Sequence, residues 1–85
     1  MNENSNSYEL IYNLDKLHTT DLGRIRIKNN ISLTDFQEPV LWCLNKIKSP
    51  DSIITRRGKN WYVSDDSCII TINTSSYTII TAHKK

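Results

Sequence analysis

The fold of this chain is decided by its last third, Ser52–Lys85, which reads SIITRRGKNWYVSDDSCIITINTSSYTIITAHKK. β-Branched and aromatic residues fill four short runs, and turn-forming residues separate these runs at Arg57-Gly58, Asp65-Asp66 and Thr74-Ser75. Such runs, broken by turn residues, are typical of strands joined by tight hairpins. We therefore expect a four-stranded antiparallel meander with strands at about residues 52–56, 59–64, 67–73 and 76–83.

The spacing of these turns predicts which side chains of the strands share a face. A two-residue turn at Asp65-Asp66 pairs Trp61 with Ile70, and directly paired residues lie on the same face. A second two-residue turn, at Thr74-Ser75, extends this pairing into the last strand. The expected core face holds Ile54, Trp61, Val63, Cys68, Ile70, Ile72, Tyr77, Ile79, Thr81 and His83. A loop with an odd number of residues at either turn would reverse this assignment, because successive side chains of a strand alternate between faces.

Residues 8–48 carry three stretches that predict helices. Leu10, Leu14 and Leu17 recur at the spacing of one helix face, and a threonine at position 19 or 20 is suited to cap the next helix. The expected helices span about residues 8–17, 21–29 and 36–48. Residues 1–7 are rich in Asn and Ser, and we expect them to be flexible.

Together these elements predict a single α+β domain over residues 8–85. We expect three N-terminal helices packed on one face of a four-stranded antiparallel β-meander, with the other face of the sheet half polar and open. The third helix carries an apolar stripe that includes Cys43 and Ile47, so the Cys43 side chain is expected in the core.

Length and composition bound the class of protein. The 85 residues are 38% hydrophobic and 24% charged, which is ordinary for one small globular domain. The net charge of +2 is too small to indicate nucleic-acid or membrane binding by itself, and no apolar run approaches the roughly 20 residues that cross a bilayer. Residues 1–7 lack the apolar core of a signal peptide, so we expect a cytoplasmic protein with no membrane partner.

Two cysteines and two histidines supply a set of candidate zinc ligands. Structural zinc takes four ligands from these residue types, and the set in this chain is His18, Cys43, Cys68 and His83. In the expected register Cys68 and His83 share the core face, although none of the sequence spacings matches a zinc knuckle. The alternatives are packed thiols with a solvated histidine, or a disulfide between the cysteines, which is the less usual state in a cytosolic chain.

Basic residues and one tyrosine form a candidate contact surface for a partner. The first hairpin and the second helix supply this set, which is Arg56, Arg57, Lys59, Tyr62, Arg24 and Arg26. Cations bind phosphate and an aromatic ring stacks on bases, so the basic hairpin at residues 56–59 and the open sheet face are also compatible with RNA. Nine acidic residues offset the eleven basic ones, however, and scattered surface charges usually serve solubility.

Several blocks distributed over the chain are specific enough to compare with known families. They are Leu17–Gly23, Arg26–Asn30, Trp42-Cys43, Ile54–Val63, Cys68–Thr71 and Ser76–Lys84. These blocks resemble those of a small bacterial family catalogued as domain of unknown function 3781, and the resemblance covers nearly the whole chain after Ser7. The family name carries no activity, but the resemblance implies that all four candidate zinc ligands lie inside the family's blocks.

Functions from two different classes are compatible with this sequence. It contains no nucleophile elbow, phosphate-binding loop or paired-carboxylate motif, so we expect a non-enzymatic binding module, stapled by zinc and directed at a protein partner. Modules of this kind include inhibitors of host or defence machinery, such as anti-CRISPR proteins that block a nuclease. The alternatives are an RNA-binding domain and a metal-independent ribonuclease of toxin type. The order of elements expected for this chain, helices followed by four strands, loosely resembles that of compact ribonuclease toxins. In such a ribonuclease, His18 or His83 would act as general base or acid, and Arg24, Arg56 or Lys59 would stabilise the charge of the phosphorane.

Overall fold

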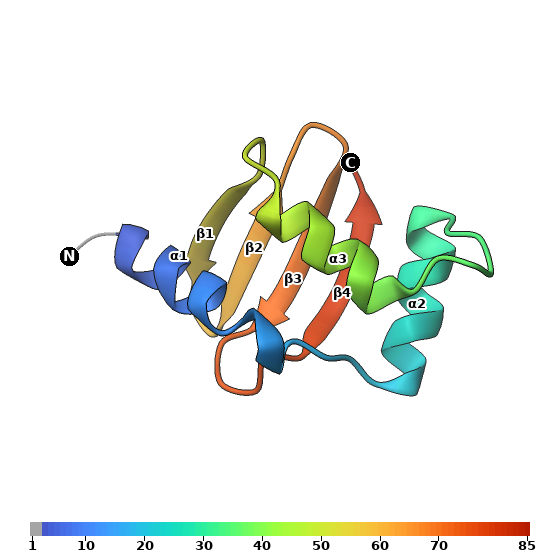
Figure 1. Ribbon diagram of the computed structural model, residues 1–85, viewed down its shortest axis with the longest axis horizontal. Coiled ribbons are helices and arrows are strands. Elements are labelled where there is room, and N and C mark those ends of the chain that lie inside the picture. The colour runs from blue at the N-terminus through green and yellow to red at the C-terminus, as the bar shows by residue number, and fades with distance from the viewer. Residues whose placement is uncertain (1–2) are drawn as a thin grey trace.

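A computed structural model describes residues 3–85 and shows helices followed by a sheet (Figure 1). The helical part contains α1 (Glu3–Tyr12), a short 3₁₀ turn (Leu14–Lys16), α2 (Asp21–Ile31) and α3 (Pro39–Lys48). The strands are β1 (Ile53–Arg57), β2 (Asn60–Ser64), β3 (Cys68–Asn73) and β4 (Ile79–Lys84). They form one antiparallel sheet in the order β1-β2-β3-β4, which confirms the predicted α+β class and the meander.

The helices take two different positions relative to the sheet. In Figure 1, α3 crosses the viewed face of the sheet, whereas α1 and α2 flank it, α1 beside the outer strand β1 and α2 beside the outer strand β4. The Asn30 side chain of α2 donates a hydrogen bond to the Thr81 hydroxyl of β4 at 3.3 Å, which ties the helix to this strand. The edge of β4 is therefore flanked by α2, which protects this strand against pairing with other chains. None of the described helices is long and apolar enough to cross a membrane.

The first helix ends earlier than its leucine spacing predicts. α1 runs to Tyr12, and the Asn13 side chain donates to the Glu9 carbonyl at 2.8 Å, where it satisfies an acceptor of the last helical turn. A 3₁₀ turn follows, and the chain is extended again at Leu17. The prediction of one continuous helix over residues 8–17 is wrong for this reason. α1 begins at Glu3, and residues 1–2 of the segment expected to be flexible lie outside the described residues.

The other two helices begin at capping residues near the predicted positions. The Thr20 hydroxyl accepts a hydrogen bond from the Gly23 amide at 2.9 Å at the start of α2, as expected. α3 begins at Pro39 and not at residue 36, because proline lacks the amide proton that an interior position needs and suits the first helical position. The Glu38 side chain caps this helix by accepting from the Leu41 amide at 3.0 Å. Residues 33–38 consequently form a loop.

The β2–β3 connection is longer than a two-residue turn but preserves the predicted faces. Ser64 pairs with Ile69, so four residues lie between these paired positions, the last of them Cys68 at the start of β3, and the Asp65 amide donates to the Cys68 carbonyl at 3.1 Å. The pairing of the two strands is shifted by two residues from the expected one. Because side chains alternate with a period of two, this shift leaves Trp61 on the core face, where it is fully buried.

The β3–β4 connection contains an irregularity that the sequence does not indicate. Its loop leaves Ile72 paired with Ile79, and a β-bulge beside Thr71 then adds one residue on the β4 strand. Tyr77 in this loop has a φ of 60°, a left-handed conformation that is rare for an aromatic residue. Its ring packs against Trp61 with the ring centroids 5.3 Å apart, so burial of the ring compensates for the strained backbone.

The bulge reverses the predicted faces over the second half of β4. Ala82 lies opposite Ile70 and is fully buried, whereas His83 lies opposite Ile69 on the other face and is exposed. Thr81 also lies on that face. The predictions that Thr81 and His83 belong to the core are therefore wrong, because one extra residue exchanges inward and outward side chains.

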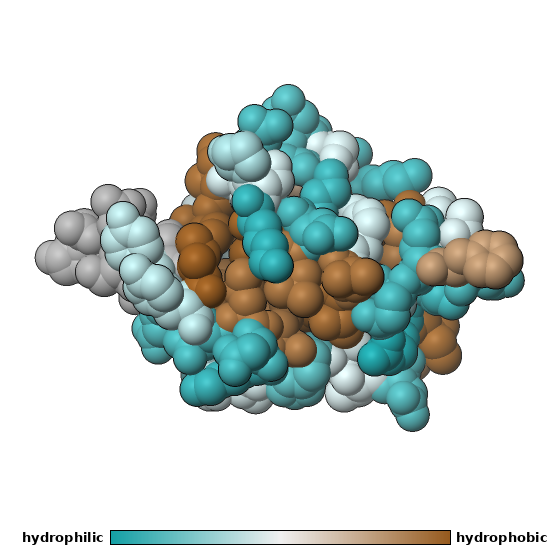
Figure 2. All heavy atoms as spheres, viewed as in Figure 1, coloured by the Kyte–Doolittle hydropathy of each residue, from teal (hydrophilic) through white to brown (hydrophobic). Residues whose placement is uncertain are grey.

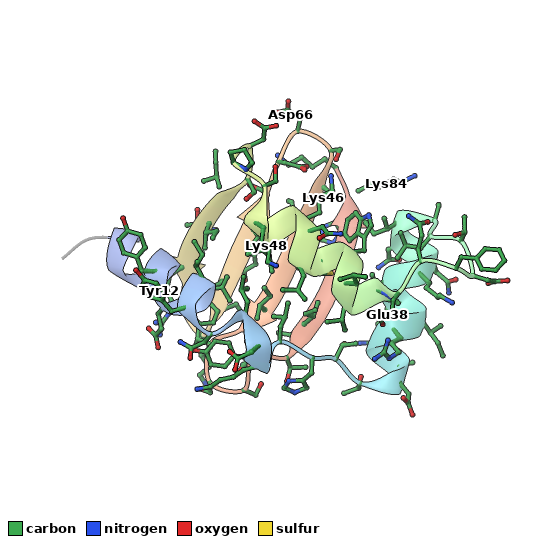
Figure 3. The ribbon with its side chains drawn as sticks, viewed as in Figure 1. Tyr12, Glu38, Lys46, Lys48, Asp66 and Lys84 are labelled. Atoms are coloured by element: carbon green, nitrogen blue, oxygen red, sulfur yellow. The ribbon has the colours of Figure 1, made fainter. Side chains whose placement is uncertain are left out.

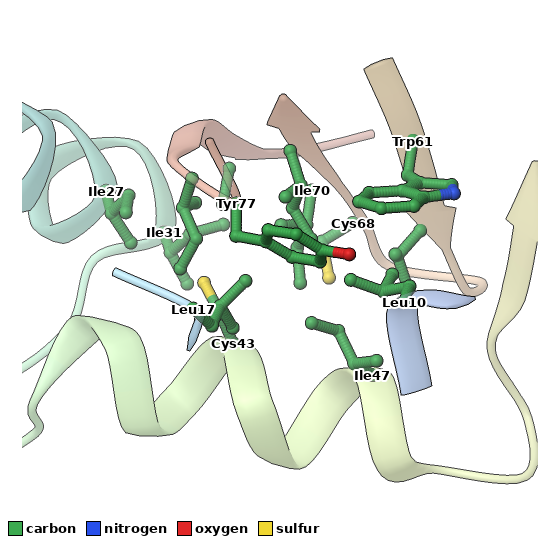
Figure 4. Packing of buried hydrophobic residues seen from close by; sticks show 14 residues of the cluster. Leu10, Leu17, Ile27, Ile31, Cys43, Ile47, Trp61, Cys68, Ile70 and Tyr77 are labelled. Carbon is green, nitrogen blue, oxygen red and sulfur yellow. The ribbon is translucent and has the colours of Figure 1, made fainter. Parts of the chain in front are cut away.

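One hydrophobic cluster fills the space between the sheet and the helices (Figure 4). Its members are Leu10, Leu17, Ile27, Ile31, Cys43, Ile47, Trp61, Val63, Cys68, Ile70, Ile72, Tyr77, Ile79 and Ala82. Each of the three α-helices contributes to it, as do β2, β3 and β4. The core predicted for β2 and β3 is confirmed, and the face of the sheet that points away from this cluster is left for other roles.

Candidate functional site

Both predicted cysteine ligands are free thiols in the core. Cys43 lies on α3 and Cys68 begins β3, and Figure 4 shows their side chains within the same cluster. Burial raises the pKa of the Cys43 thiol to about 12, with a further contribution from the nearby Cys68, and burial also raises the pKa of Cys68. Without a metal ion beside them, both thiols are therefore protonated at neutral pH. Both side chains are buried among apolar residues, the surroundings in which a free cysteine packs as a small hydrophobic residue.

The two predicted histidine ligands lie at opposite ends of β4. His18 precedes α2, and its ring lies 2.9 Å from the Lys16 carbonyl through Nδ1 and 3.1 Å from the Thr78 hydroxyl through Nε2. Because a carbonyl only accepts, the neutral ring carries its proton on Nδ1, and Nε2 accepts from Thr78. His83 lies five residues beyond Thr78, roughly 16 Å along the strand.

The predicted zinc ligands are consequently not brought together. The two thiols lie inside the core, His83 lies on the opposite face of the sheet, and both ring nitrogens of His18 already have hydrogen-bond partners. Among the described residues, no group of three His, Cys, Asp or Glu side chains could hold a metal ion. These residues do not fit a tetrahedral zinc site. His18 and His83 are also too far apart to act together on one phosphodiester, so the ribonuclease hypothesis concerns one of the two histidines with a basic residue.

The predicted basic surface is divided between two parts of the molecule. Arg56 and Arg57 are neighbours in β1 and so lie on opposite faces of the sheet. Arg56 is paired with Trp61 on the core side, whereas Arg57 is paired with Asn60 on the open side. Lys59 is exposed in the tight turn that follows β1. Arg24 and Arg26 belong to α2, which lies beside β4 at the other side of the sheet.

A shallow hollow on the open face brings two of the predicted partner-binding residues together. It has a volume of about 230 Å³, and its lining is Thr55, Arg57, Tyr62, Ser64 and Ile69. Thr55 and Tyr62 are paired directly across β1 and β2, and Arg57 is two positions from Thr55 on the same face. The hollow, called the sheet-face hollow below, thus combines a guanidinium, an aromatic ring, two hydroxyls and one apolar side chain.

A second candidate surface surrounds Phe36 in the loop between α2 and α3. The Phe36 side chain is 99% exposed, and Ile25 and Leu41 near it are 55% and 56% exposed. A hollow of about 460 Å³ lies between this loop and α2, a smaller one of about 220 Å³ lies between the loop and α3, and Phe36 lines both. Figure 2 shows a hydrophobic lobe protruding where this loop lies in Figure 1. Ile25, Phe36, Leu41 and the two hollows are called the Phe36 surface below.

Hydrogen bonds connect the loop of the Phe36 surface to itself and to both neighbouring helices. The Gln37 side chain accepts from the Thr34 amide at 2.9 Å, which closes the loop on itself. Glu38 joins the two helices, because one carboxylate oxygen caps α3 at the Leu41 amide and the other accepts from the Arg24 guanidinium of α2. Figure 3 shows Glu38 at this junction. The hollows on either side of the loop are therefore preformed.

Sequence reasoning missed this surface because it placed residues 36–38 inside the third helix. In that position Phe36 would belong to the first turn of a helix, and nothing would mark it as an exposed binding residue. The available signal was the order of residues around Pro39: a capping pattern, then the one phenylalanine of the chain, then a proline that can only begin a helix. That order indicates a loop with an aromatic residue near its apex.

One family model matches almost the entire chain. It is described as "Protein of unknown function (DUF3781)", and it matches residues 11–83. The chain belongs to this family. The match confirms the resemblance of the sequence blocks, and it includes all four predicted zinc ligands as well as Phe36 and Tyr62. No curated protein and no solved structure matches the chain.

Proposed function

We propose that the protein is a non-enzymatic module that binds a protein partner through the Phe36 surface. The observation that carries this proposal is the 99% exposure of Phe36 between two preformed hollows. Folding gains nothing from holding a phenyl ring in water, and patches of exposed apolar side chains with a polar rim mark sites of protein contact, as the grouping of Phe36 with the exposed Ile25 and Leu41 suggests here. Aromatic residues are also enriched at protein–protein interfaces, where single side chains provide much of the binding energy.

The charges around the larger hollow indicate what a partner would present. Three carboxylates and two cations line it, namely Asp21, Asp35, Glu38, Arg24 and Lys28. Arg24 and Glu38 are paired with each other, so the remaining rim is slightly acidic. A partner with an apolar cavity for the phenyl ring and a basic group beside that cavity would be complementary to this surface.

Burial of the Phe36 ring in a partner would by itself contribute substantially to the affinity. Full burial of a phenylalanine side chain contributes roughly 1.5–3 kcal/mol, or about 10- to 150-fold in affinity. Because Glu38 and Gln37 already fix the loop, binding orders few additional groups and loses little of this gain. Phe36 is therefore expected to be the main anchor of the interface.

The class of partner remains the one proposed from the sequence. The proposed partner is a protein of host or defence machinery, for example a nuclease that an anti-CRISPR protein blocks. This proposal rests on the small size of the chain and on its lack of a catalytic motif. Zinc is not part of this proposed function, since the predicted ligands lie in the core, on the open face and in an unrelated hydrogen-bond pair.

Matched variants test the proposed function. Immobilised wild type captures proteins from a bacterial lysate, and each captured protein is then purified and titrated against wild type, Phe36→Ser and Tyr12→Ser. Tyr12 is the control, because it is an aromatic residue of α1 that is 78% exposed and lines neither hollow. We expect Phe36→Ser to weaken binding about tenfold or more and Tyr12→Ser less than about twofold. Equal affinity of wild type and Phe36→Ser for every captured protein would contradict the proposal.

A further inference from the structure

Among the residues of the four strands, none on the face that points away from the core carries a carboxylate. The strand pairing places the following side chains on it: Ile53, Thr55, Arg57, Asn60, Tyr62, Ser64, Ile69, Thr71, Asn73, Thr81 and His83. All of them except Thr71 keep part of their surface exposed. Nine acidic residues are present elsewhere in the chain, so their exclusion from this face leaves a surface with an anion-attracting guanidinium and many neutral hydrogen-bonding groups.

Tyr62 lies at the centre of this face. It is paired with Thr55 on β1 and with Thr71 on β3, both of which have short side chains, and it remains partly exposed between them. An aromatic ring in this position offers a stacking platform for an unpaired base. Such stacking contributes about 5- to 150-fold in affinity per base.

Arg57 lines the sheet-face hollow together with Tyr62. Its guanidinium can donate two parallel hydrogen bonds to one phosphate. The hollow, at about 230 Å³, is smaller than the roughly 300–1,000 Å³ of pockets that enclose drug-sized ligands, so it suits one base with the phosphate outside. The hydroxyls of Thr55 and Ser64 in the same lining are suited to bond a ribose 2′-hydroxyl, a group that DNA lacks.

We propose that this face binds single-stranded RNA, with one base on Tyr62 and an adjoining phosphate on Arg57. A duplex cannot use the site, because paired and stacked bases do not reach the ring. The site is separate from the Phe36 surface, which lies between α2 and α3, and the two proposals rest on different residues. Arg57 and Lys59 supply about two phosphate contacts, so raising the salt from about 50 to about 200 mM should weaken binding about sevenfold.

Fluorescence anisotropy with a labelled oligouridylate of about 12 nucleotides tests this proposal. In about 50 mM salt, wild type should bind saturably, and Tyr62→Ala should weaken binding about tenfold or more. Tyr62→Phe keeps the ring and should stay within about twofold of wild type. Arg57→Gln should weaken binding about fivefold or more, whereas Arg26→Gln, which removes the same charge from exposed α2, should change it less than about twofold.

Three results would overturn the proposal. The first is the absence of saturable binding by wild type at about 1 mM protein. The second is equal weakening by Arg26→Gln and Arg57→Gln, which would show attraction by net charge alone. The third is binding of duplex RNA, or of an oligothymidylate of the same length, as tightly as the oligouridylate. Phe36→Ser should bind RNA like wild type, so a failure here is distinguishable from a failure of the protein-binding proposal.

Discussion

Two loops of the molecule each carry one aromatic residue and use it in opposite ways. In the β3–β4 loop, Tyr77 is only 9% exposed and packs on Trp61, although its backbone adopts a left-handed conformation with a φ of 60°. In the α2–α3 loop, Phe36 is 99% exposed, although hydrogen bonds of its neighbours fix the loop. The fold uses the first ring as a core residue and leaves the second ring in solvent.

This difference separates what the chain requires for folding from what it offers to a partner. A strained backbone persists where the burial of an aromatic ring compensates for it. An exposed ring on a fixed loop contributes little to stability, but it is ready for an interface. Substitutions should therefore change stability at the Tyr77 loop and binding at the Phe36 loop.

The largest expected effect is the loss of the Tyr77 ring. Tyr77→Ala should lower the free energy of unfolding by about 3–5 kcal/mol, because it leaves a cavity beside the fully buried Trp61. Tyr77→Phe keeps the packed ring and should cost less than about 1.5 kcal/mol. Urea denaturation followed by tryptophan fluorescence measures both variants. A loss below about 1 kcal/mol for Tyr77→Ala would show that this ring does not support the core.

The loop between β2 and β3 is held by a carboxylate instead of a ring, and its expected effect is smaller. Asp65 accepts hydrogen bonds from the Lys46 side chain at 2.9 Å, the Ser67 amide at 2.8 Å and the Cys68 amide at 3.0 Å. Asp65→Ala should lower the free energy of unfolding by about 1–3 kcal/mol, since it leaves these donors without an acceptor. An unchanged denaturation midpoint would show that water replaces the carboxylate without loss.

The same residue gives the stability a predictable dependence on pH. The hydrogen bond from Lys46 and that from the Ser67 amide hold the pKa of Asp65 well below its usual range. Because the pKa is lower in the folded than in the unfolded state, ionised Asp65 stabilises the fold above about pH 4, and this stabilisation is lost as the pH falls further. The difference in unfolding free energy between wild type and Asp65→Asn should therefore shrink between about pH 7 and about pH 2. A constant difference would contradict this assignment.

Substitution of Gly23 by alanine should change the free energy of unfolding by less than the variants above. Helix propensity alone predicts that alanine stabilises α2 here, but we expect it to destabilise the protein. A Cβ atom at this position would clash with the Thr19 hydroxyl oxygen. That hydroxyl donates to the Ile79 carbonyl at 2.8 Å, directly after the Tyr77 loop. Gly23→Ala should lower the free energy of unfolding by about 1 kcal/mol, although alanine favours an isolated helix by a similar amount.

A double variant checks the cause of this effect. Thr19→Ala removes the hydroxyl that the new Cβ would meet, so Gly23→Ala should be less destabilising in the Thr19→Ala background than in wild type. Thermal unfolding of the four chains completes the cycle. Stabilisation by Gly23→Ala alone would mean that the close contact with Thr19 is relieved without loss.

The smallest expected change in stability is at Phe36. Phe36→Ser should alter the free energy of unfolding by no more than about 0.5 kcal/mol, because the ring is 99% exposed. Measured beside Tyr77→Ala, this variant sharpens the contrast between the two loops. A loss of about 2 kcal/mol would show that Phe36 packs on the protein and is not held free for a partner.

The architecture and most of the core follow from local sequence patterns. The β-branched runs predict the strands, and side-chain alternation predicts the core positions up to Ile79, because a shift of two residues leaves faces unchanged. The second half of β4 does not follow from such patterns. Near the bulge, the Ile79 amide donates to the His18 carbonyl at 2.7 Å, and this contact joins segments 61 positions apart. No pattern within the last hairpin reports such a contact.

The candidate sites were predictable only in part for related reasons. The grouping of Arg57 and Tyr62 on the open face follows from alternation in β1 and β2 and agrees with the predicted surface. The predicted zinc site rests on residue type and on a pairing of β3 with β4 that places His83 on the core face beside Cys68. The bulge changes this pairing and places His83 on the open face. The Phe36 surface depends on where α3 begins, which the cap at Glu38 and the proline after it determine.

Photocrosslinking from position 36 tests the central claim most directly. p-Benzoylphenylalanine replaces Phe36 in one variant and Tyr12 in another, and bacteria that produce each variant are irradiated. Both positions are exposed aromatic residues, and Tyr12 lies on α1, away from the Phe36 surface. We predict a covalent adduct with a partner protein from position 36 and none from position 12. Adducts from position 12 alone, or none from either position, would contradict binding through the Phe36 surface.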